Sequence, residues 1–205
     1  MPARVTPDFD GAAGLQALFA DVAGEPALGL AISGGSDSLA LMLLAQRWAA
    51  SLDAAPRLVV YSVDHGLRPE AAGEVAMVLQ AAAALGLVAR GLAWAGPKPE
   101  TGLQEAARLA RYRLMGAAMA EDGATVLLTA HHLQDQAETV LMRMAHGSGI
   151  EGLKGMTGMA EIEGLRVHRP LLHVDPTALR SLVDAAGLTP AEDPSNADLH
   201  YERVR

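Results

Sequence analysis

Short apolar runs alternate along this chain with longer segments of helical character. Four of the runs have the length of buried strands and occupy residues 28–32, 58–63, 88–94 and 126–130. The segments that follow them predict helices over residues 36–50, 69–85, 101–121 and 134–145. Such alternation is typical of a parallel sheet wrapped by helices. We therefore predict a Rossmann-like α/β fold, an open, mostly parallel twisted sheet with helices on both faces.

The pattern becomes looser after residue 149. A short strand is predicted over residues 166–172 and a last helix over residues 176–186. Earlier in the chain, Pro69 is expected in the first turn of a helix and Gly86 just past the end of the same helix. No linker, internal repeat or low-complexity segment divides the sequence, so residues 1–205 are predicted to form one domain.

A glycine turn joins the first predicted strand to the first long helix. Residues 33–38 read Ser-Gly-Gly-Ser-Asp-Ser. A strand, a glycine turn and a helix start together form the setting in which backbone N–H groups hold a phosphate. Adjacent glycines let successive amides point into one concavity, and serine hydroxyls add donors. The candidate nucleotide-binding residues are Ser33, Gly34, Gly35, Ser36, Asp37 and Ser38.

Asp37 distinguishes this loop from the phosphate loops of kinases and GTPases. Those loops carry a lysine before their Ser or Thr, whereas this chain has an aspartate at that position. A carboxylate beside a phosphate is repelled unless a cation lies between them, so we expect Asp37 to face a bridging Mg²⁺. The alternative is that Asp37 only caps the N-terminus of the helix.

A second group of polar residues follows the fourth predicted strand. His131, Asp135 and Glu138 are spaced by four and three residues, which predicts one face of a helix start. In open α/β sheets, ligands bind beyond the carboxyl ends of the strands, where the glycine turn also lies. We therefore expect these three residues to be functional. The alternative is that the two acidic residues are ordinary first-turn residues and that His131 caps a strand.

Two further pairs are candidates for the same edge of the sheet. Asp64 and His65 follow the second predicted strand and are expected to contact a nucleoside, although Asp64 is equally suited to form a turn. Arg108 and Arg111 lie on the third predicted helix, and an arginine that reaches the site would stabilise charge developing on a phosphate. The alternative for these arginines is a solvated, salt-bridged helix face that includes Glu105.

Composition narrows the possible chemistry. The chain has 205 residues, of which 50% are hydrophobic and 20% charged, enough to bury one sizeable core. It has no cysteine, which excludes persulfide, disulfide and iron–sulfur chemistry within the chain, and its seven histidines show no zinc-binding pattern. No apolar run is long enough to span a membrane and no secretory signal is evident, so we expect a cytoplasmic protein.

The hexapeptide at residues 33–38 resembles the signature of the PP-loop, or N-type, ATP pyrophosphatases, which adenylate a substrate and release pyrophosphate. Within that group the chain is similar to the N-terminal catalytic domain of the bacterial tRNA(Ile)-lysidine synthases. The resemblance extends over about residues 28–205 and implies a fold of the PP-loop, adenine nucleotide alpha-hydrolase type. Four further stretches carry it: residues 63–68, residues 105–113, the run from Ala130 to Gly149, and residues 193–196 with Tyr201.

The resemblance implies a two-step reaction. ATP adenylates the C2 carbonyl oxygen of cytidine 34 in the CAU anticodon of tRNA(Ile), and pyrophosphate leaves. The ε-amine of L-lysine then displaces AMP to form lysidine, which changes the codon read from AUG to AUA. By resemblance, Asp135 and Glu138 bind the lysine amine, Arg111 is the catalytic arginine, and ATP with Mg²⁺ is required. Two carboxylates suit an ammonium group, and one of them or His131 is the candidate base.

Two positions depart from the family pattern. Gln134 stands where Asp is usual, which removes the acidic neighbour of Asp135, and His146 stands where Arg is usual, which removes a phosphate or RNA contact. A net charge of −8 and an aromatic content of 3% suit tRNA binding poorly. By resemblance, we expect tRNA-binding C-terminal domains beyond residue 205. A homodimer is compatible with the sequence, which does not decide the oligomeric state.

Two other functions remain open on the sequence alone. One is an ATP-dependent synthetase that adenylates a small molecule. It would need ammonia or a glutaminase partner, because the chain has no cysteine nucleophile for a glutaminase. The other is a non-catalytic module that binds ATP as a sensor, which would not need His131, Asp135 and Glu138 together at the nucleotide edge.

Overall fold

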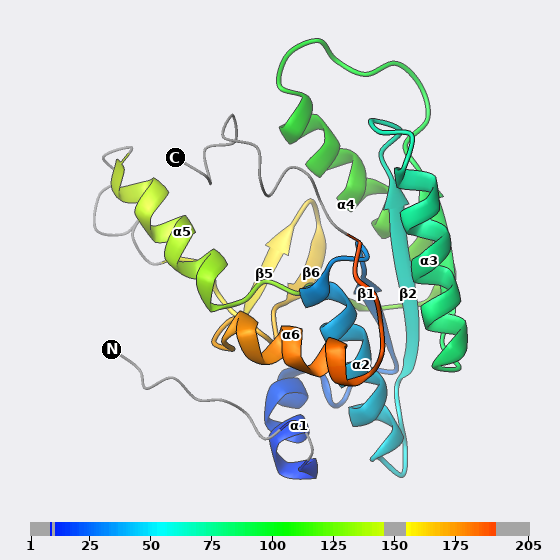
Figure 1. The fold of residues 1–205 in the computed structure, drawn as a ribbon, viewed down its shortest axis with the longest axis vertical. Helices are drawn as coiled ribbons and strands as arrows, with labels where there is room; N and C mark the ends of the chain where they lie inside the picture. Colours follow the sequence, from blue (N-terminus) through cyan, green and yellow to red (C-terminus); the bar gives the residue numbers. More distant parts are fainter. Residues whose placement is uncertain (1–8, 10, 146–154, 192–205) are drawn as a thin grey trace.

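The computed structural model describes residues 9, 11–145 and 155–191. Six strands form one sheet in the order β3-β2-β1-β4-β6-β5, and all neighbouring pairs are parallel except β5 with β6. The strands are β1 Ala27–Ala31, β2 Arg57–Asp64, β3 Val88–Ala93, β4 Val126–Leu128, β5 Met159–Ile162 and β6 Leu165–His168. The predicted open, mostly parallel sheet is therefore confirmed (Figure 1).

Helices connect most of the strands. They are α1 Ala12–Phe19, the short 3-10 helix η1 Ala20–Val22, α2 Ser36–Ala50, α3 Ala71–Ala84, α4 Leu103–Asp122, α5 Leu133–Ala145 and α6 Pro176–Ala185. The five helices expected from the sequence correspond to α2 to α6. Gly86 follows α3 with a φ of +71°, as expected just past a helix end. Pro69, in contrast, precedes α3 and does not lie in its first turn.

Helix α1, the short η1 and strand β5 were not expected from the sequence, and β4 and β6 end earlier than predicted. Helix α1 has eight residues and buries only two side chains, so its apolar signal is small. Strand β5 has four residues and pairs antiparallel with β6 at the edge of the sheet. The strand expected over residues 166–172 ends at His168, because residues 170–173 form a turn.

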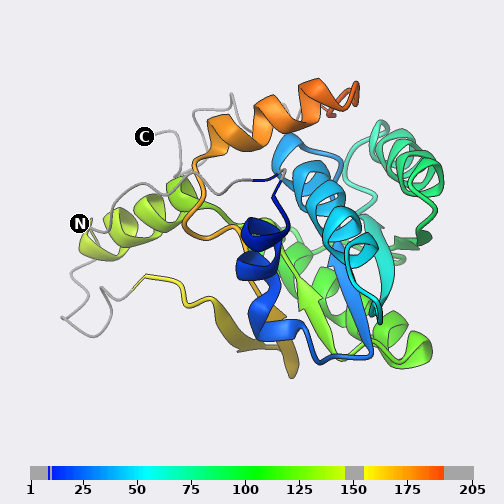
Figure 2. The ribbon, with the colours of Figure 1, turned by 90° about the horizontal axis from the view of Figure 1, so that it is seen from below.

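The sheet separates two apolar layers. On one face, Leu30 and Val60 pack in a layer with residues of α1, α2, α3 and α6. On the other face, Tyr61 and Leu127 pack against α4. Figure 2 shows α2, α3 and α6 along one side of the sheet and α4 along the other. The expectation of helices on both faces is thus confirmed.

Helix α2 is enclosed on nearly all sides, and this holds the loop before it in place. All side chains from Leu39 to Ala45 are buried, because α1 and α6 pack against the helix. Asp175 caps α6 by accepting a hydrogen bond from the Thr177 amide at 2.9 Å, and Pro176 begins that helix. Although α2 is strongly apolar, no helix in the described part of the chain is long and apolar enough to cross a bilayer.

Candidate functional site

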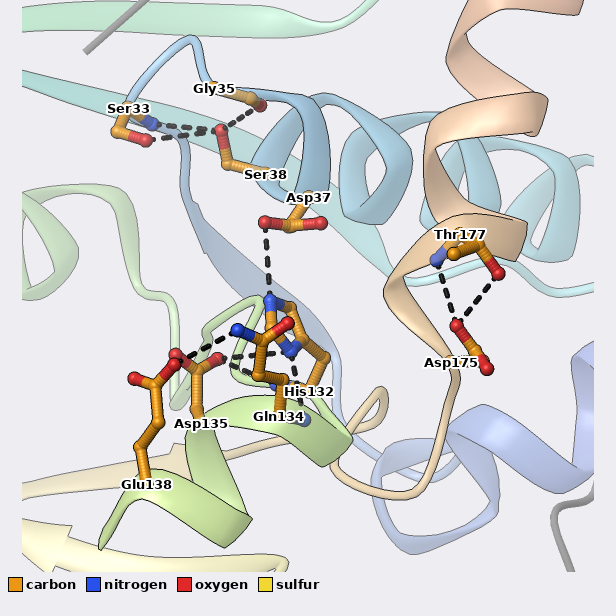
Figure 3. A network of polar contacts seen from close by, with 10 residues as sticks. All are labelled: Ser33, Gly35, Asp37, Ser38, His132, Gln134, Asp135, Glu138, Asp175 and Thr177. Carbon is orange, nitrogen blue, oxygen red and sulfur yellow. Dashed lines mark hydrogen bonds and ion pairs between the residues drawn. The ribbon is translucent and has the colours of Figure 1, made fainter. Parts of the chain in front are cut away.

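The loop of residues 33–38 connects β1 to α2 and is organised around one hydroxyl group. The Ser38 Oγ accepts hydrogen bonds from the amides of Ser33 and Gly34, both at 3.2 Å, and donates to the Gly35 carbonyl oxygen at 2.8 Å. Figure 3 shows Ser38 beneath the turn with these contacts to Ser33 and Gly35. Gly34 has a φ of +95°, which a side chain rarely tolerates. The turn therefore depends on a glycine at this position.

The same loop presents unused hydrogen-bonding capacity. The Ser36 Oγ is buried and has no partner in the described part of the chain. Gly35 is the N-cap of α2 and provides no side-chain cap to the first turn. The N-terminus of a helix carries free amides and a partial positive charge, so this end of α2 fits an anion such as a phosphate.

Asp37 contacts a histidine that lies just before α5. Its Oδ2 lies 3.3 Å from Nε2 of His132, which precedes α5 (Figure 3). The backbone amide of His132 donates to Oδ2 of Asp135 at 2.9 Å, and Nδ1 of its ring lies 3.5 Å from the same oxygen. Burial acts to lower the pKa of His132, but hydrogen bonding and charge from Asp37, with Asp135 and Glu138, outweigh it and raise the pKa. His132 thus joins the loop to the acidic residues of α5.

The sequence interpretation selected the neighbouring histidine instead. His131 lies before α5, which begins at Leu133, so the prediction that it shares a helix face with Asp135 and Glu138 is wrong. The ring of His131 lies beside Thr129, with 3.0 Å between Nδ1 and the Thr129 hydroxyl oxygen. No signal in the sequence ranks one of two adjacent histidines above the other, because only the conformation before α5 decides which ring faces Asp37.

The pKa values of the two histidines are also shifted in opposite directions. Burial and then the charge of Arg169 lower the pKa of His131 to about 4, with Asp135 opposing the change and Arg111 and Arg108 adding to it. His131 is therefore neutral at physiological pH and a weak base. The pKa of its neighbour is instead raised by acidic groups. Burial lowers both pKa values, but acidic residues outweigh it at His132, whereas arginines add to it at His131.

Asp135 and Glu138 lie on the first turns of α5, as the sequence predicted. Gln134 Nε2 donates to Oε1 of Glu138 at 3.0 Å (Figure 3). The residue that replaces the usual aspartate therefore supports Glu138 by donating a hydrogen bond from a neutral amide, where a carboxylate would repel it. The structure thus brings together Asp37, His132, Asp135, Gln134 and Glu138.

The residues after β2 form a separate part of the same edge. Asp64 Oδ1 accepts a hydrogen bond from the Gly66 amide at 2.7 Å, which is the turn-forming role left open above. His65 lies edge-on to Trp94, with 6.2 Å between ring centroids, and its Nδ1 is buried without a partner in the described residues. Burial first, and then Arg111, lower the pKa of His65. Trp94 was not selected from the sequence, where it only ended a predicted strand.

Of the other residues selected from the sequence, some lie in the described part of the chain and some lie outside it. Arg108 and Arg111 flank the ring of Tyr112, with their Cζ atoms 5.2 and 5.5 Å from the ring centroid. His146, residues 147–149, residues 193–196 and Tyr201 lie outside the described residues. Within the described part of the chain, no three or more acidic or histidine side chains converge to hold a metal ion.

Curated bacterial proteins share about half of the residues of this chain. It is 49% identical over 194 residues to a tRNA(Ile)-lysidine synthase from a Bradyrhizobium species, covering 95% of this chain and 54% of that protein. It is 52% identical over 188 residues to a tRNA(Ile)-lysidine synthase from Rhodopseudomonas palustris, covering 92% of this chain and 54% of that protein. The chain spans about half the length of these curated relatives.

Solved structures share the fold at much lower sequence identity. A U34-tRNA thiolase from Methanococcus maripaludis has a TM-score of 0.74 and 16% identity, covering 89% of this chain and 65% of that chain. An NMN synthetase from Francisella tularensis has a TM-score of 0.57 and 10% identity, covering 87% of this chain and 70% of that chain. At these identities the similarity concerns the fold alone.

A family model described as a PP-loop domain matches residues 9–205, nearly the whole chain. The match includes the Ser-Gly-Gly-Ser-Asp-Ser loop, which lies at the carboxyl end of β1 and opens α2 in the structure. The resemblance recognised from the motifs is thereby confirmed, and the chain belongs to the PP-loop domain family.

Proposed function

We propose that this protein is an ATP-dependent ligase that joins the ε-amine of lysine to C2 of cytidine 34 in the CAU anticodon of tRNA(Ile). The observation that carries the proposal is the contact of Asp37 in the phosphate loop with His132, which also contacts Asp135. One histidine thereby couples a nucleotide-binding loop to acidic residues suited to an amine. The lysidine synthases that are about half identical to this chain support the choice of substrates.

In the first step of the proposed reaction, the loop binds the phosphates of ATP. Ser36 Oγ and the first-turn amides of α2 are the unused donors that fit them. Asp37 is the residue that would hold Mg²⁺, an ion that commonly uses one or two carboxylates, and the bound ion would offset phosphate charge. The C2 carbonyl oxygen of the cytidine attacks the α-phosphorus, and pyrophosphate leaves. Arg111 stabilises the charge that develops on the phosphate.

In the second step, lysine replaces AMP on the base. Asp135 and Glu138 bind the cationic amine and hold it near the activated carbon. The amine must lose a proton to attack, and a nearby carboxylate can accept it. His131 lies before α5 with its ring beside Thr129, whereas Asp135 and Glu138 lie on α5, so the proposal gives the base role to a carboxylate of the pair and not to His131. The new C–N bond forms as the C–O bond to AMP breaks.

Asp64 and His65 complete the proposed nucleotide site. The Asp64 carboxylate shapes the turn at Gly66, and His65 lies in that turn beside Trp94. We propose that this turn contacts the nucleoside of ATP. Binding of tRNA by further domains, the cytoplasmic location and a homodimeric state stay predictions from the sequence.

The proposal is tested by incorporation of radiolabelled lysine into a tRNA(Ile) transcript with a CAU anticodon, using the full-length protein with ATP and Mg²⁺. Asp37→Asn should abolish both pyrophosphate release and lysine incorporation. Glu138→Gln should retain tRNA-dependent pyrophosphate release but reduce lysine incorporation at least about tenfold, since it removes the charge that binds the amine. The matched control is Glu161→Gln, which neutralises an exposed carboxylate on β5 and should change neither step.

The outcome that contradicts the proposal is equally specific. If the protein binds and hydrolyses ATP but incorporates no lysine into this tRNA, lysidine formation is wrong and adenylation of a small molecule becomes the better explanation. If Glu138→Gln and Glu161→Gln behave alike, the assignment of the amine site is wrong even where the ligase activity is present.

A further inference from the structure

Arg169 is a buried cation just past the carboxyl end of β6. The residue is only 7% exposed. Its Nη1 donates to the Thr157 carbonyl oxygen at 2.7 Å, but its Nε is buried and has no hydrogen-bond partner in the described part of the chain. A buried guanidinium with an unused donor is costly unless an anion satisfies it. The contacts of Arg169 in the described part of the chain therefore do not explain why this charged side chain is buried.

Strand alternation places Arg169 on the α4 side of the sheet. Val167 and Leu127 are paired in register and point into the layer that α4 covers. Arg169 comes two residues after Val167, and Thr129 comes two residues after Leu127. The hydrogen bond from the Thr129 amide to the His168 carbonyl oxygen, at 3.0 Å, continues the ladder to this point. Arg169 and Thr129 therefore lie on the same face, at the edge where ligands bind.

Helix α4 supplies two more guanidinium groups on this side. Arg108 and Arg111 lie against the ring of Tyr112, with Cζ atoms 5.2 and 5.5 Å from its centroid. Tyr112 is itself buried in the layer between α4 and the sheet, with Val167 and Leu127. Arg108 is exposed and Arg111 half-buried, so both are accessible to a ligand from solvent.

The electrostatics of His131 are consistent with this arrangement. After burial, the charges of Arg169, Arg111 and Arg108 lower the pKa of His131, and the charge of Asp135 opposes them. Arg108 also acts on Arg169 and adds to the lowering of its pKa by burial. Positive charge therefore gathers locally in a chain whose net charge is −8.

We propose that Arg169 and Arg108 form, beside Arg111, a second phosphate-binding site on the α4 side of the sheet edge, adjacent to the ATP site in which Arg111 acts. Guanidinium groups bind phosphate through planar sets of N–H donors, and the unpartnered Nε of Arg169 supplies one of them. The phosphate belongs either to ATP, as the pyrophosphate portion, or to an RNA backbone. The site does not depend on the ligase reaction proposed above, because phosphate binding requires no turnover.

The test is a titration of the 205-residue chain with inorganic phosphate and with pyrophosphate, followed by NMR. The Nε–H signal of Arg169 should shift, because a donor without a partner gains one. His131 is the second reporter. A bound anion favours the protonated ring and should raise its pKa from about 4 to about 5 or above. The Nε–H signal belongs to Arg169 itself, so it distinguishes phosphate bound here from phosphate bound at the loop before α2.

Substitutions then identify the residues. Arg169→Gln and Arg108→Gln should each weaken phosphate binding about tenfold or more, as expected when a charge-assisted hydrogen bond is lost. Arg108 is exposed, so its variant tests the proposal even where Arg169→Gln fails to fold. The controls are Arg166→Gln, an exposed position on β6 that pairs with Glu25 at 2.9 Å, and Arg113→Gln on α4. Both controls should bind phosphate as tightly as the unaltered chain.

Two further ligands assign the source of the phosphate. A non-hydrolysable ATP analogue with Mg²⁺ should move both reporters if the site holds the nucleotide. If it holds RNA, an RNA hairpin with a CAU loop should move them, and Arg108→Gln should reduce the salt dependence of RNA binding by about one ion.

The proposal is overturned if no phosphate compound moves either reporter, or if Arg108→Gln binds phosphate as tightly as Arg113→Gln. It is also overturned if L-lysine moves the reporters and phosphate does not, because the site would then bind a carboxylate. Lysine incorporation can fail while both reporters respond, so this proposal and the ligase proposal are separable.

Discussion

Asp37 and His132 lie 3.3 Å apart, Oδ2 to Nε2, although they are far apart in the sequence. Asp37 is in the first turn of α2 and His132 precedes α5. Strands β1 and β4, which lead into these two segments, are neighbours in the sheet. The contact therefore follows from strand order, and it links the phosphate loop to the acidic residues of α5.

This contact should appear as a coupling energy in a double-mutant cycle of Asp37→Asn and His132→Gln. We expect about 0.5–1.5 kcal/mol in urea unfolding without Mg²⁺, because the histidine is buried but the aspartate is partly exposed. The pKa of His132 is raised, so the ion pair is fully present below about pH 6.5 and is lost as the pH rises through the folded pKa. The coupling should therefore be larger at about pH 6 than at about pH 9.

The control for this cycle pairs Asp37→Asn with Arg180→Gln, whose own partner is Asp184 on α6. Asp37 pairs with His132 and Arg180 pairs with Asp184, so the effects of the two changes should add. A coupling between Asp37 and His132 that does not change with pH would show that the contact is a neutral hydrogen bond.

Two adjacent glycines of the phosphate loop should respond differently to alanine. Gly34 has a φ of +95°, and a Cβ there would lie 3.0 Å from Met77 Cε, so Gly34→Ala should destabilise the fold by about 1–2 kcal/mol. At Gly35 a Cβ would meet only the Ser33 hydroxyl, at 3.7 Å, in the described part of the chain, so Gly35→Ala should change stability by less than about 0.5 kcal/mol. Urea unfolding checks both, and equal losses would contradict the loop geometry.

His131 should make stability fall in mild acid. Its pKa is about 4 in the folded protein and about 6.5 in an unfolded chain, so between these values only the unfolded state binds the proton. Folding stability should therefore decrease as the pH falls from about 6.5 to about 4, by about 1–3 kcal/mol for this group. His131→Gln should show a smaller decrease over the same range in urea unfolding. Parallel curves for the two proteins would mean that the ring is not held neutral by its surroundings.

Gly29 in β1 should tolerate no side chain. A Cβ there would lie 2.8 Å from Tyr61 Cε2 and 3.3 Å from Leu127 Cδ1, and the Tyr61 ring is held by a hydrogen bond of 2.9 Å to Asp122. Gly29→Ala should therefore destabilise the fold by about 1–3 kcal/mol.

The contrasting variant is Gly73→Ala in α3, where a Cβ would contact nothing within 4 Å among the residues that the structure describes. This change should stabilise the helix by up to about 1 kcal/mol, because alanine has the higher helix propensity. Thermal unfolding should therefore move in opposite directions for the two variants. A loss of stability in Gly73→Ala would contradict the open surroundings of that position.

The sequence predicted those features of the fold that depend on local pattern. The alternation of apolar runs with helical segments located four of the parallel strands and the helices that follow them. Burial of both sheet faces requires such a pattern, so it is visible in the chain itself. The glycine turn at residues 33–38 was equally visible, because its backbone conformation demands particular residues. Helix α1 and strand β5 were missed because short elements with few buried side chains leave little pattern.

The sequence by itself therefore determined the class of fold, the phosphate loop and the presence of acidic residues at the start of α5. Only the tertiary structure decided which of two adjacent histidines faces Asp37, and that Arg169 is buried just past the end of β6. Neighbouring residues have nearly the same local pattern, but their side chains enter different surroundings once strands from distant parts of the chain are paired. The strand order β1-β4-β6 creates those surroundings, and so it sets the charge that each histidine experiences.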